Sequence, residues 1–460
     1  PLHLLLLDAG PPVLVMTSGN PSAEPLAHEN EQAIERLSGI ADAFLLHNRD
    51  IYNPCDDSVV RFGEGGAAMV RRARGYAPEP LTPKRYRVEE SVLALGPELK
   101  NTITVTRKGQ MVVSQHLGDL TNTPAVEAFS RAVWRIMDLL GVEPSVIACD
   151  EHPHYFSSRF AEDRFPGLPL ERVQHHHAHM AAVMVEHDLP MEEQVIAALW
   201  DGTGFGRDES TWGGEFFVGG YGDFKRLAHT RALPLPGGDA ATKHPWRVAV
   251  AALHELGSNL QDLSLKALRR QPQEDRELLM TLLERRLRCP MSGGAGRLFD
   301  AAAAILDFHP EVSDEVSYEA QAAIELEALC ASSPLTPRKE LLPYDYSDGV
   351  LDLLPSLEAL AELTRRGQEA DGLAARFTDT AARACADVVL EIGAREGIAT
   401  AVLSGGCFAN RRLLDLVRGR IAQKGMEVLV PRFFPPNDGG VSLGQAAVAL
   451  ARRAHLHSRR

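Results

Sequence analysis

Short apolar runs separated by turn-forming residues predict the first elements of this chain. Residues 13–16, 43–46 and 58–62 have the apolar, β-branched composition of strands, and residues 29–37 have the spacing of an amphipathic helix. A segment rich in glycine, proline and arginine follows at residues 71–80. Such a composition is typical of a linker, so the pattern predicts that one folded unit ends near residue 80.

The remainder of the chain predicts two α/β parts on either side of a long helical stretch, residues 246–392. Buried strands are expected to end at Asp201 and at Ser404, and each leads into a glycine-rich turn. We interpret this pattern as two α/β lobes with a nucleotide cleft between them. The expected strands are 92–95, 102–106, 111–114, 146–149, 195–200, 399–403 and 426–430, and the expected helices are 125–140, 175–185, 410–421 and 440–452.

Composition and charge narrow the class of protein. The 460 residues carry a net charge of −14, with 45% hydrophobic and 24% charged residues, which is typical of a globular protein of two to four domains. No apolar stretch of the sequence is long enough to span a membrane, and the acidic balance argues against a protein built mainly to bind nucleic acid. The six cysteines include no C-x-x-C pair, which predicts free thiols in a reducing, cytoplasmic compartment.

A histidine cluster is the most specific chemical signal. Residues 173–179 have the sequence VQHHHAH, which places His175 and His179 one helical turn apart on one face, within reach of one metal ion. A surface run of histidines is the alternative interpretation. Two imidazoles do not complete a metal site, and Asp201 and Asp438, each beside glycines, are candidates for carboxylate ligands or for ordinary turn residues.

Two glycine-rich turns have the composition of phosphate-binding loops. Residues 201–206 (DGTGFG) and 404–410 (SGGCFAN) each follow an expected strand, and their glycines allow backbone amides to approach a phosphate. Either turn alone is weak support, since many structural turns contain two glycines, but together they suggest a nucleotide bound between two lobes. Cys407 is a disfavoured candidate for a nucleophile, because no partner histidine lies near it in the sequence.

A separate set of polar residues lies in the first part of the chain. Thr17, Ser18 and Asn20 share one turn, and Ser58 and Arg61 share an expected strand. Hydroxyl groups together with a guanidinium suit a phosphate or a carboxylate. A polar loop and an exposed arginine explain the same residues at least as well when they are considered alone.

Taken in order, these segments resemble the hydrogenase-maturation carbamoyltransferase family of HypF type. Residues 17–22 and 56–61 resemble the second half of a YrdC-like domain, and residues 71–80 resemble the family's interdomain segment. The resemblance covers nearly the whole chain, and several motifs in the right order make it more specific than any one of them. The motifs that resemble the TsaD-like C-terminal domain are 96–102 (GPELKNT), 114–120 (SQHLGDL), 173–179 (VQHHHAH), 201–206 (DGTGFG), 296–300 (GRLFD), 404–410 (SGGCFAN) and 437–440 (NDGG).

The resemblance implies an α/β fold in two parts. Residues 1–80 would form the C-terminal part of a YrdC-like domain, residues 81–92 a linker, and residues 93–460 a two-lobed, actin-like (ASKHA, TsaD-like) carbamoyl transfer domain. Family members begin with an acylphosphatase-like domain, a Cys-rich zinc-finger region and the first half of the YrdC-like domain. We expect this chain to begin partway through that YrdC-like fold, and we expect adenylate formation to depend on basic residues of the other half.

The resemblance also implies an activity. Family proteins take carbamoyl phosphate and ATP to carbamoyl adenylate, and pass the carbamoyl group to the C-terminal Cys thiolate of a partner protein, HypE, on the route to the cyanide ligands of NiFe hydrogenase. Because the partner supplies the nucleophile, the chain itself needs no catalytic cysteine. A tunnel between the YrdC-like and C-terminal domains is expected to exclude water, since hydrolysis would waste the intermediate.

The same resemblance assigns roles to the candidate residues. The implied ligands of a divalent iron or zinc ion are His175, His179, Asp201 and Asp438. The residues implied to contact the nucleotide are Gly202, Thr203, Gly204, Ser404, Gly405 and Gly406 at the phosphates, Asn410 near the adenine, and Asp300 near the ribose, with Glu319 or Glu325 as a further ribose contact. The YrdC-like phosphate or nucleotide residues are Thr17, Ser18, Asn20, Ser58 and Arg61.

Four alternatives stay open. Threonylcarbamoyl transfer to tRNA uses the same two folds, and the basic stretch 71–87 favours it, whereas the fusion of both folds, the DGTG sequence and the acidic charge disfavour it. A small-molecule O-carbamoyltransferase carries its YrdC-like part after the TsaD-like domain, which is the opposite order. A sugar kinase or chaperone ATPase of the actin-like superfamily is disfavoured by the four histidines. The last alternative is a chain that binds nucleotide or HypE without turnover.

Overall fold

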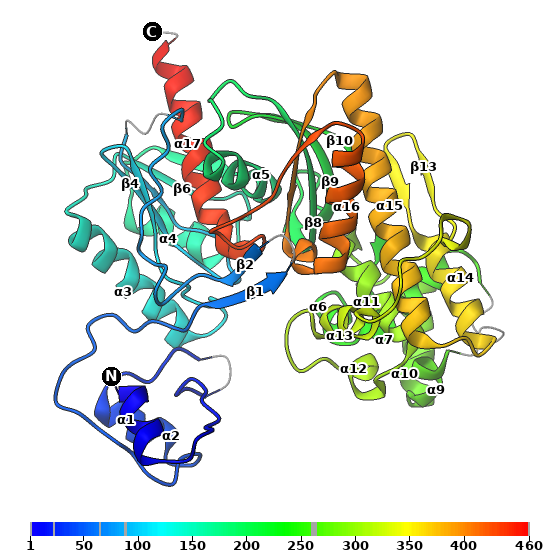
Figure 1. Cartoon of the computed structure of the whole chain (residues 1–460), viewed down its shortest axis with the longest axis horizontal. Coiled ribbons are helices and arrows are strands. Elements are labelled where there is room, and N and C mark those ends of the chain that lie inside the picture. The colour runs from blue at the N-terminus through cyan, green and yellow to red at the C-terminus, as the bar shows by residue number, and fades with distance from the viewer. Residues whose placement is uncertain (1, 22–23, 64–65, 87–89, 259–264, 459–460) are drawn as a thin grey trace.

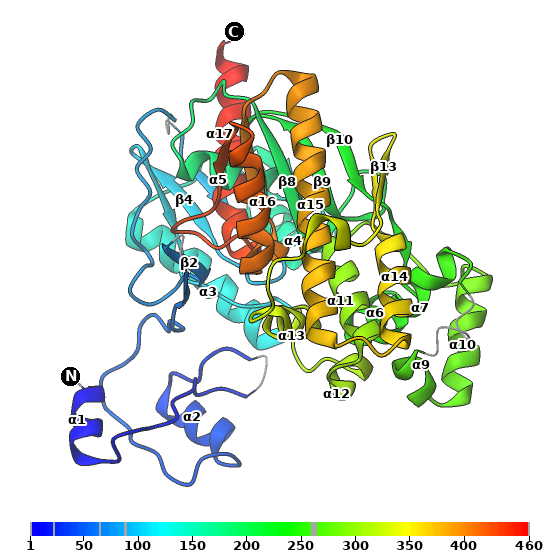
Figure 2. The same ribbon diagram turned by 45° about the vertical axis from the view of Figure 1, so that its right-hand side comes forward.

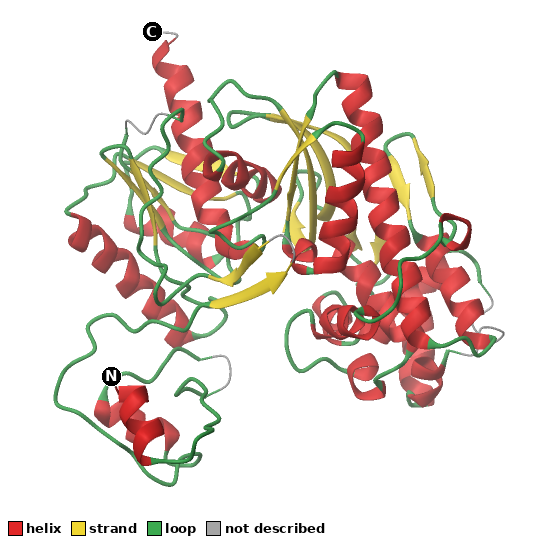
Figure 3. Cartoon of the chain, viewed as in Figure 1, coloured by secondary structure: helices red, strands yellow, loops and turns green. Residues whose placement is uncertain are grey.

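The computed structural model describes residues 2–21, 24–63, 66–86, 90–258 and 265–458. A small N-terminal unit precedes two larger lobes, each built around its own β-sheet with helices packed against it (Figure 1, Figure 3). This arrangement confirms the predicted fold class, a partial α/β unit followed by a two-lobed α/β domain. The predicted linker includes residues 87–89, and the motif at 17–22 includes Ser22; these residues lie outside the described ones.

The N-terminal unit contains little regular structure. Its elements are α1 (Leu2–Ala9), α2 (Asn30–Leu37) and the antiparallel strands β1 (Val59–Gly63) and β2 (Gly66–Arg71). The predictions for α2 and β1 are confirmed, but residues 13–16 and 43–46 form no strand. The described part of this unit gives them no partner strand, and Val15 is 98% exposed as a result. Both ribbon views place α1 and α2 away from the two lobes (Figure 1, Figure 2).

The first lobe is built on a five-stranded sheet in the order β5-β4-β3-β6-β7. Its elements are β3 (Val92–Ala94), β4 (Thr104–Arg107), β5 (Gln110–Val113), α3 (Thr123–Leu140), β6 (Val146–Asp150), α4 (Phe156–Arg164), β7 (Leu170–Val173), α5 (His175–Glu186) and α17 (Val441–Ser458). Alternate side chains of each strand enter different cores: Leu93 packs with the residues of α3 and α4, whereas Val92 and Ala94 pack with those of α5 and α17. The expected meander and helices of this lobe are confirmed.

The second lobe is built on a larger mixed sheet in the order β13-β14-β10-β9-β8-β15-β16, with β11 and β12 at its side. Its strands are β8 (Val195–Phe205), β9 (Thr211–Gly219), β10 (Phe224–Thr230), β11 (Leu233–Pro234), β12 (Met291–Ser292), β13 (Asp345–Ser347), β14 (Val350–Asp352), β15 (Thr400–Ser404) and β16 (Glu427–Leu429). Its helices are α6 (Asp239–Lys243), α7 (Pro245–Glu255), α9 (Lys266–Arg270), α10 (Gln273–Glu284), α11 (Ala295–Leu306), α12 (Pro310–Asp314), α13 (Gln321–Cys330), α14 (Leu354–Arg365), α15 (Ala370–Glu396) and α16 (Arg411–Gln423). The expected helical stretch is therefore present, interrupted by β12 and by the short β13–β14 pair.

One strand of this sheet differs from the prediction. Strand β8 was expected to end at residue 200, but it continues to Phe205, with an irregular register between Trp200 and Gly204. The neighbouring strand β9 extends far enough to pair with it, since Gly204 lies opposite Trp212. The glycines after Asp201 therefore form a bulged strand rather than a terminal turn, and this bulge turns Asp201 towards α5.

Helices α5 and α17 form a layer between the two sheets, because both pack in one core with Ala197 and Leu199 of β8 as well as with the first-lobe strands. The candidate site is built around the beginning of α5. None of the helices in the described ranges combines the length and the apolar composition that a membrane crossing requires.

Gly444 permits the close crossing of these two helices. A Cβ atom built on it would lie 1.8 Å from the backbone oxygen of Ala178 in α5. We expect Gly444→Ala to lower the free energy of unfolding by about 3 kcal/mol or more, because backbone atoms would have to move. The matched control is Gly372→Ala in α15, where a Cβ meets nothing within 4 Å and removal of a helical glycine stabilises by about 1 kcal/mol. Urea unfolding measures both, and equal stabilities for the two variants would contradict the packing.

Candidate metal centre and nucleotide site

The histidine run forms the first turns of a fully buried helix. Gln174 precedes α5 and its side-chain oxygen accepts a hydrogen bond from the His177 backbone amide at 2.9 Å, which satisfies one of the free amides at the helix start. His175 and His179 lie on the same face, with ring centroids 5.0 Å apart, and both are 1% exposed. A surface run of histidines is therefore excluded.

Four predicted ligands converge at this helix. His175 and His179 come from α5, Asp201 comes from the bulge of β8, and Asp438 begins the 3-10 turn η3 (Asp438–Gly440) that leads into α17. Their candidate ligand atoms all lie within 4.8 Å of one another. The His179 Nε2 atom lies 3.0 Å from an Asp201 Oδ atom, and the Asp438 Oδ1 atom lies 3.6 Å from the His175 Nε2 and 3.7 Å from the His179 Nε2. The residues that the sequence proposed as ligands are thus brought together from three elements.

The polar atoms at the centre of this cluster suit a metal ion. The Nε2 atoms of His175 and His179 and one Asp201 carboxylate oxygen are buried, and the described residues give them no hydrogen bond, although His179 Nε2 and the Asp201 oxygen lie only 3.0 Å apart. Atoms that face a common centre rather than one another have this geometry. Burial by itself raises the pKa of Asp438, but the neighbouring imidazoles of His175 and His179 hold that pKa below its ordinary value. Two imidazoles and two carboxylates are a suitable donor set for iron or zinc.

Asp150 orients one of the candidate ligands. This carboxylate is fully buried at the end of β6, and its Oδ2 atom lies 2.9 Å from His175 Nδ1. A hydrogen bond to Nδ1 leaves Nε2 as the unprotonated atom that a metal requires. Asp150 was not predicted as a site residue, because the only signal in the sequence is a carboxylate at the end of an expected strand.

We expect Asp150→Asn to weaken metal affinity by about 10- to 100-fold while the chain stays folded, because the amide supports His175 less well than the carboxylate does. Metal titration with a chromophoric chelator measures the affinity, and circular dichroism reports the fold. Asp138→Asn, at an exposed position of α3, is the matched control. Unchanged metal affinity in Asp150→Asn would show that Asp150 does not orient His175.

The other two histidines have different environments. His177 turns away from the cluster, and its Nε2 lies 2.8 Å from the backbone oxygen of Gly220. His176 lies against Gly204, where a Cβ atom would come within 2.5 Å of its ring. Burial, which is the largest influence on both rings, lowers the pKa of His177 to about 4 and also lowers that of His176. Both rings are therefore neutral and pack beside the four candidate ligands His175, His179, Asp201 and Asp438, which we call the metal cluster.

The two glycine segments meet beside the metal cluster. Gly405 has φ of +100°, and a Cβ there would lie 2.3 Å from the backbone oxygen of Trp200, so the segment after β15 lies directly against β8. A Cβ on Gly406 would lie 3.0 Å from an Asp201 carboxylate oxygen. Gly202 lies on the other side of Asp201, and a Cβ there would be 3.1 Å from the Arg297 guanidinium. The structure thus groups Gly202, Ser404, Gly405 and Gly406, together with Thr203, near Asp201, whereas Gly204 contacts the histidines.

Arg297 and Asp300 extend this group from α11. Asp300 is 4% exposed, and its Oδ2 lies 3.1 Å from an Arg297 guanidinium nitrogen. Burial raises the pKa of Asp300, although Arg297 opposes this effect. The Nη1 atom of Arg297 makes this ion pair, whereas its Nε atom is buried and has no hydrogen-bond partner among the described residues. This donor suits an anionic ligand beside Gly202, and Arg297 is a functional candidate that the sequence analysis quoted within a motif without assigning it a role.

Several other predicted contacts have partners within the protein. The Asn410 side chain accepts a hydrogen bond from the Leu413 amide at 3.0 Å and begins α16, so its amide oxygen is engaged at the helix start. Glu325 lies 2.5 Å from His309, away from the metal cluster, whereas Glu319 pairs with Lys100. Burial raises the pKa of the Cys407 thiol well above its ordinary value, which disfavours the thiolate that a nucleophile needs.

The candidate phosphate-binding residues of the N-terminal unit do not all lie in one site. Ser18 and Asn20 line a cavity of about 470 Å³ whose other walls include Arg71, Lys100, Glu319 and Asn437; we call it the interdomain cavity. Thr17 is not among its lining residues. Ser58 instead donates to the backbone oxygen of Arg74 at 2.9 Å.

Arg61 also lies outside this cavity. It forms a two-pronged ion pair with Glu327 of α13 at 2.9 and 3.0 Å, and donates to the backbone oxygen of Ala409 at 2.9 Å. The guanidinium therefore attaches β1 to the second lobe, next to the turn that contains Ser404–Ala409. Because these contacts join positions more than 260 residues apart, the local sequence around Arg61 does not reveal them.

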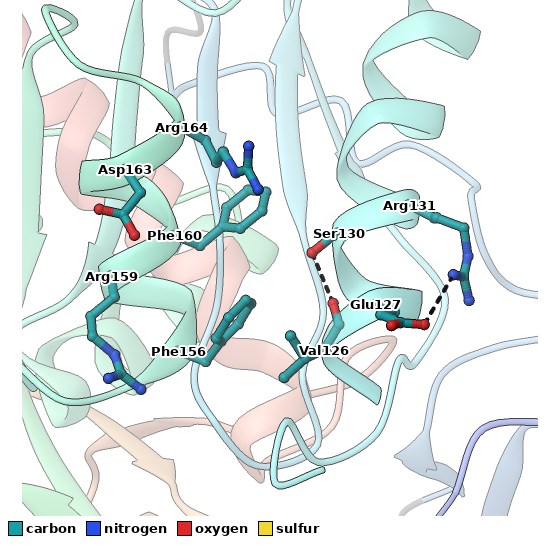
Figure 4. A pocket seen from close by; sticks show the side chains of 9 residues that line it. All are labelled: Val126, Glu127, Ser130, Arg131, Phe156, Arg159, Phe160, Asp163 and Arg164. Atoms are coloured by element: carbon teal, nitrogen blue, oxygen red, sulfur yellow. Dashed lines mark hydrogen bonds and ion pairs between the residues drawn. The ribbon is translucent and has the colours of Figure 1, made fainter. Parts of the chain in front are cut away.

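A further pocket of about 680 Å³ lies between α3 and α4, separate from all the predicted site residues (Figure 4). Phe156 and Phe160 face Val126 across it, and the charged side chains of Arg131, Arg159 and Arg164 lie around its edge (Figure 4). The metal cluster and the glycine segments do not contribute to it.

Family models match almost the whole chain. The model described as "Carbamoyltransferase, Kae1-like Domain, second subdomain" matches residues 197–445, and the one described as "HypF Kae1-like domain" matches residues 87–186. The model described as "Telomere recombination", of the Sua5, YciO and YrdC proteins, matches residues 1–73. These matches follow the order in which the motifs occur.

Relatives and solved structures agree with these models. Carbamoyltransferase HypF2 of Cupriavidus necator is 43% identical over 96% of this chain, and carbamoyltransferase HypF of Synechocystis is 36% identical over 99% of it; the matches cover 56% and 60% of those two proteins. The chain therefore spans little more than half the length of these relatives. A HypF homolog of Cupriavidus necator is 39% identical over 79% of this chain and 94% of its own length.

The crystal structure of a full-length HypF in the phosphate- and nucleotide-bound form superposes with a TM-score of 0.88 and 38% identity, over 98% of this chain and 69% of that one. The T. kodakarensis HypF structure superposes with a TM-score of 0.86 and 31% identity, over 95% of this chain and 57% of that one. On these matches of sequence, motif order and structure, the chain belongs to the HypF carbamoyltransferase family.

Proposed function

We propose that this chain transfers a carbamoyl group from carbamoyl adenylate to the C-terminal Cys thiolate of a HypE-type partner during maturation of NiFe hydrogenase. The observation that carries the proposal is the meeting of a four-residue metal cluster with two glycine segments at Asp201. Carbamoyl adenylate is an activated acyl group with AMP as its leaving group, so both its reacting carbonyl and its phosphate need neutralisation. The name and bound ligands of the matched full-length structure are in keeping with this chemistry.

The residues of the cluster have separate tasks in this proposal. His175, His179, Asp201 and Asp438 would hold iron or zinc, which supplies positive charge next to the phosphate or carbonyl oxygen when it is bound. Backbone amides of the glycine segments donate to the same oxygens, and Arg297 offers a buried donor to the phosphate. Asp300 receives the ribose hydroxyls, as the resemblance implies.

The nucleophile in this proposal comes from the partner. Burial raises the pKa of the thiols of Cys385 and Cys407, the cysteines close to the glycine segments, so neither offers a ready thiolate. All six cysteines are free, in keeping with a reducing cytoplasm as the place of action. A partner thiolate that enters the cleft from outside satisfies this requirement.

The interdomain cavity supports a protected route for the adenylate. It is bounded by Ser18 and Asn20 of the YrdC-like part and by Asn437 and Gly439, which flank the metal-cluster residue Asp438. Carbamoyl phosphate and ATP are the precursors in this proposal. Residues 1–80, 81–92 and 93–460 remain our proposed YrdC-like part, linker and transfer domain.

The test is a transfer assay with chemically made carbamoyl adenylate. The 460-residue chain, loaded with iron or zinc, is mixed with carbamoyl adenylate and either a peptide that ends in the partner's cysteine or the same peptide ending in serine. In a separate reaction it is mixed with threonylcarbamoyl adenylate and tRNA that carries unmodified adenosine, so that AMP is the leaving group in every case. Mass spectrometry is expected to find one added carbamoyl group on the cysteine peptide alone. Modified tRNA would favour threonylcarbamoyl transfer, carbamoylation of the serine peptide would favour an O-carbamoyltransferase, and nucleotide binding with no product would leave a binding chain without turnover.

A further inference from the structure

The loop after β3 holds Lys100 in an unusual backbone conformation. Lys100 has φ of +46°, in the left-handed region that non-glycine residues rarely adopt. Its backbone amide donates to the Asp119 side chain at 2.7 Å, and the next residue, Asn101, is fully buried. Strained conformations of this kind are found disproportionately at functional positions, because the surrounding structure must compensate for their cost.

The Lys100 side chain bridges the two lobes. Its ammonium group forms an ion pair with Glu319, which precedes α13 in the second lobe, and both side chains line the interdomain cavity. Asn437 and Gly439 line the same cavity on either side of Asp438. Burial lowers the pKa of Lys100, but the negative charges of Glu319, Asp438 and Asp119 outweigh this effect and raise it, so the ammonium stays charged. A charged ammonium group therefore lines the cavity, near enough to Asp438 to interact with it electrostatically.

Glu319 has no comparable structural attachment. Its side chain is 52% exposed, and its described partner is Lys100, whereas the ion pair of Arg61 with Glu327 nearby is reinforced by the Arg411 amide. An exposed carboxylate that meets one ammonium contributes at most about 1 kcal/mol. A phosphate group, which carries more charge and more acceptor oxygens, displaces such a carboxylate readily. Arg71 and Ser18 line the same cavity and add a second cation and a hydroxyl.

We propose that Lys100 receives the phosphoryl group of a nucleotide in the interdomain cavity, in direct competition with Glu319. The exchange of carboxylate for phosphate frees the Lys100–Glu319 bridge between the lobes and brings the phosphate next to Asp438. The nature of the nucleotide, an adenylate, rests on the proposed function; the anion site itself does not.

Lys100 and Glu319 carry opposite charges, so their substitutions are expected to change the affinity for an anion in opposite directions. Isothermal titration calorimetry of the 460-residue chain with AMP, and separately with inorganic phosphate, is expected to show tighter binding for Glu319→Gln by about fivefold, because the competing carboxylate is gone. Lys100→Gln is expected to weaken binding by about tenfold, and Lys100→Arg to keep most of it. The double variant Lys100→Gln/Glu319→Gln is expected to bind no more tightly than Lys100→Gln alone.

Glu362→Gln is the matched control, since Glu362 forms surface ion pairs on α14 far along the chain from the cavity. A bridge with only a structural role predicts that both single variants lose affinity, or that neither changes, and either result overturns the proposal. Thermal denaturation identifies a variant that fails to fold. If Lys100→Gln fails in this way, Lys100→Arg and Glu319→Gln still show whether the affinity for the anion rises or falls. These titrations measure binding and not carbamoyl transfer, so their outcome does not depend on whether the proposed activity is found. If the substitutions change the affinity for AMP but not for phosphate, the site binds nucleotides; if they change both equally, it binds phosphate groups in general.

Discussion

Replacement of both His175 and His179 by alanine is expected to remove the bound metal and to reduce carbamoyl transfer by at least about 100-fold. The two imidazoles provide half of the four converging ligands, and their Nε2 atoms have no other partner in the structure. Asp201 and Asp438 would then face each other without the neutralising metal, so the phosphate of the adenylate would meet uncompensated negative charge. Elemental analysis by mass spectrometry measures the metal, and the peptide assay measures transfer.

The control for this double variant is His154→Ala, since His154 is exposed and lies outside α5. It is expected to leave both metal content and transfer unchanged. The α5 helix is fully buried, so circular dichroism must show that the double variant remains folded. A folded double variant that retains its metal and transfers carbamoyl groups at the normal rate would contradict the assignment of all four ligands.

The second large effect is expected from Asp300→Ala, which is predicted to weaken ATP binding by about 10- to 100-fold. Asp300 is a buried carboxylate with Arg297 as its charged neighbour, and a hydrogen bond from a ribose hydroxyl to such a group contributes about 1.5–3 kcal/mol. Fluorescence titration with a labelled ATP analogue measures the affinity.

Asp138→Asn, at an exposed position on α3, serves as the control for general charge effects. Asp300→Asn removes the negative charge but keeps the size of the side chain and an oxygen that accepts a hydrogen bond. This variant is therefore expected to bind ATP with an affinity between those of the wild type and Asp300→Ala. If ATP binds equally well to the wild type, Asp300→Asn and Asp300→Ala, the nucleotide does not bind against α11.

Two of the candidate metal ligands, His175 and His179, could be predicted to lie together because two independent signals in the sequence coincide. The i, i+4 spacing of His175 and His179 needs only a helix to place both rings on one face, and the apolar residues after them predict that helix. Asp201 and Asp438 were assigned by resemblance, since no local pattern distinguishes them from turn residues. The convergence of three elements on one point is a tertiary feature that no single segment encodes.

The predictions that differ from the structure do so because they too depend on contacts between residues that are distant in the sequence. Residues 13–16 have strand composition, but a strand is stable only beside another strand, and the two described strands of the N-terminal unit, β1 and β2, pair with each other. Strand β8 continues past Asp201 because β9 is long enough to pair with it. The glycines after Asp201 had predicted a turn at this point. Arg61 was expected at a phosphate, whereas long-range contacts hold it against Glu327. Asp150 was missed because its role depends on a neighbour 25 residues away.

The most direct measurement of the proposed function is the mass of a peptide that ends in cysteine after incubation with carbamoyl adenylate and the metal-loaded chain. The wild type is expected to add one carbamoyl group to the peptide's cysteine, and Asp438→Ala, assayed in parallel, is expected to add none within the same time. Hydrolysis of the adenylate with no carbamoylated peptide in the wild type, or equal transfer by the wild type and Asp438→Ala, would contradict carbamoyl transfer at this metal centre.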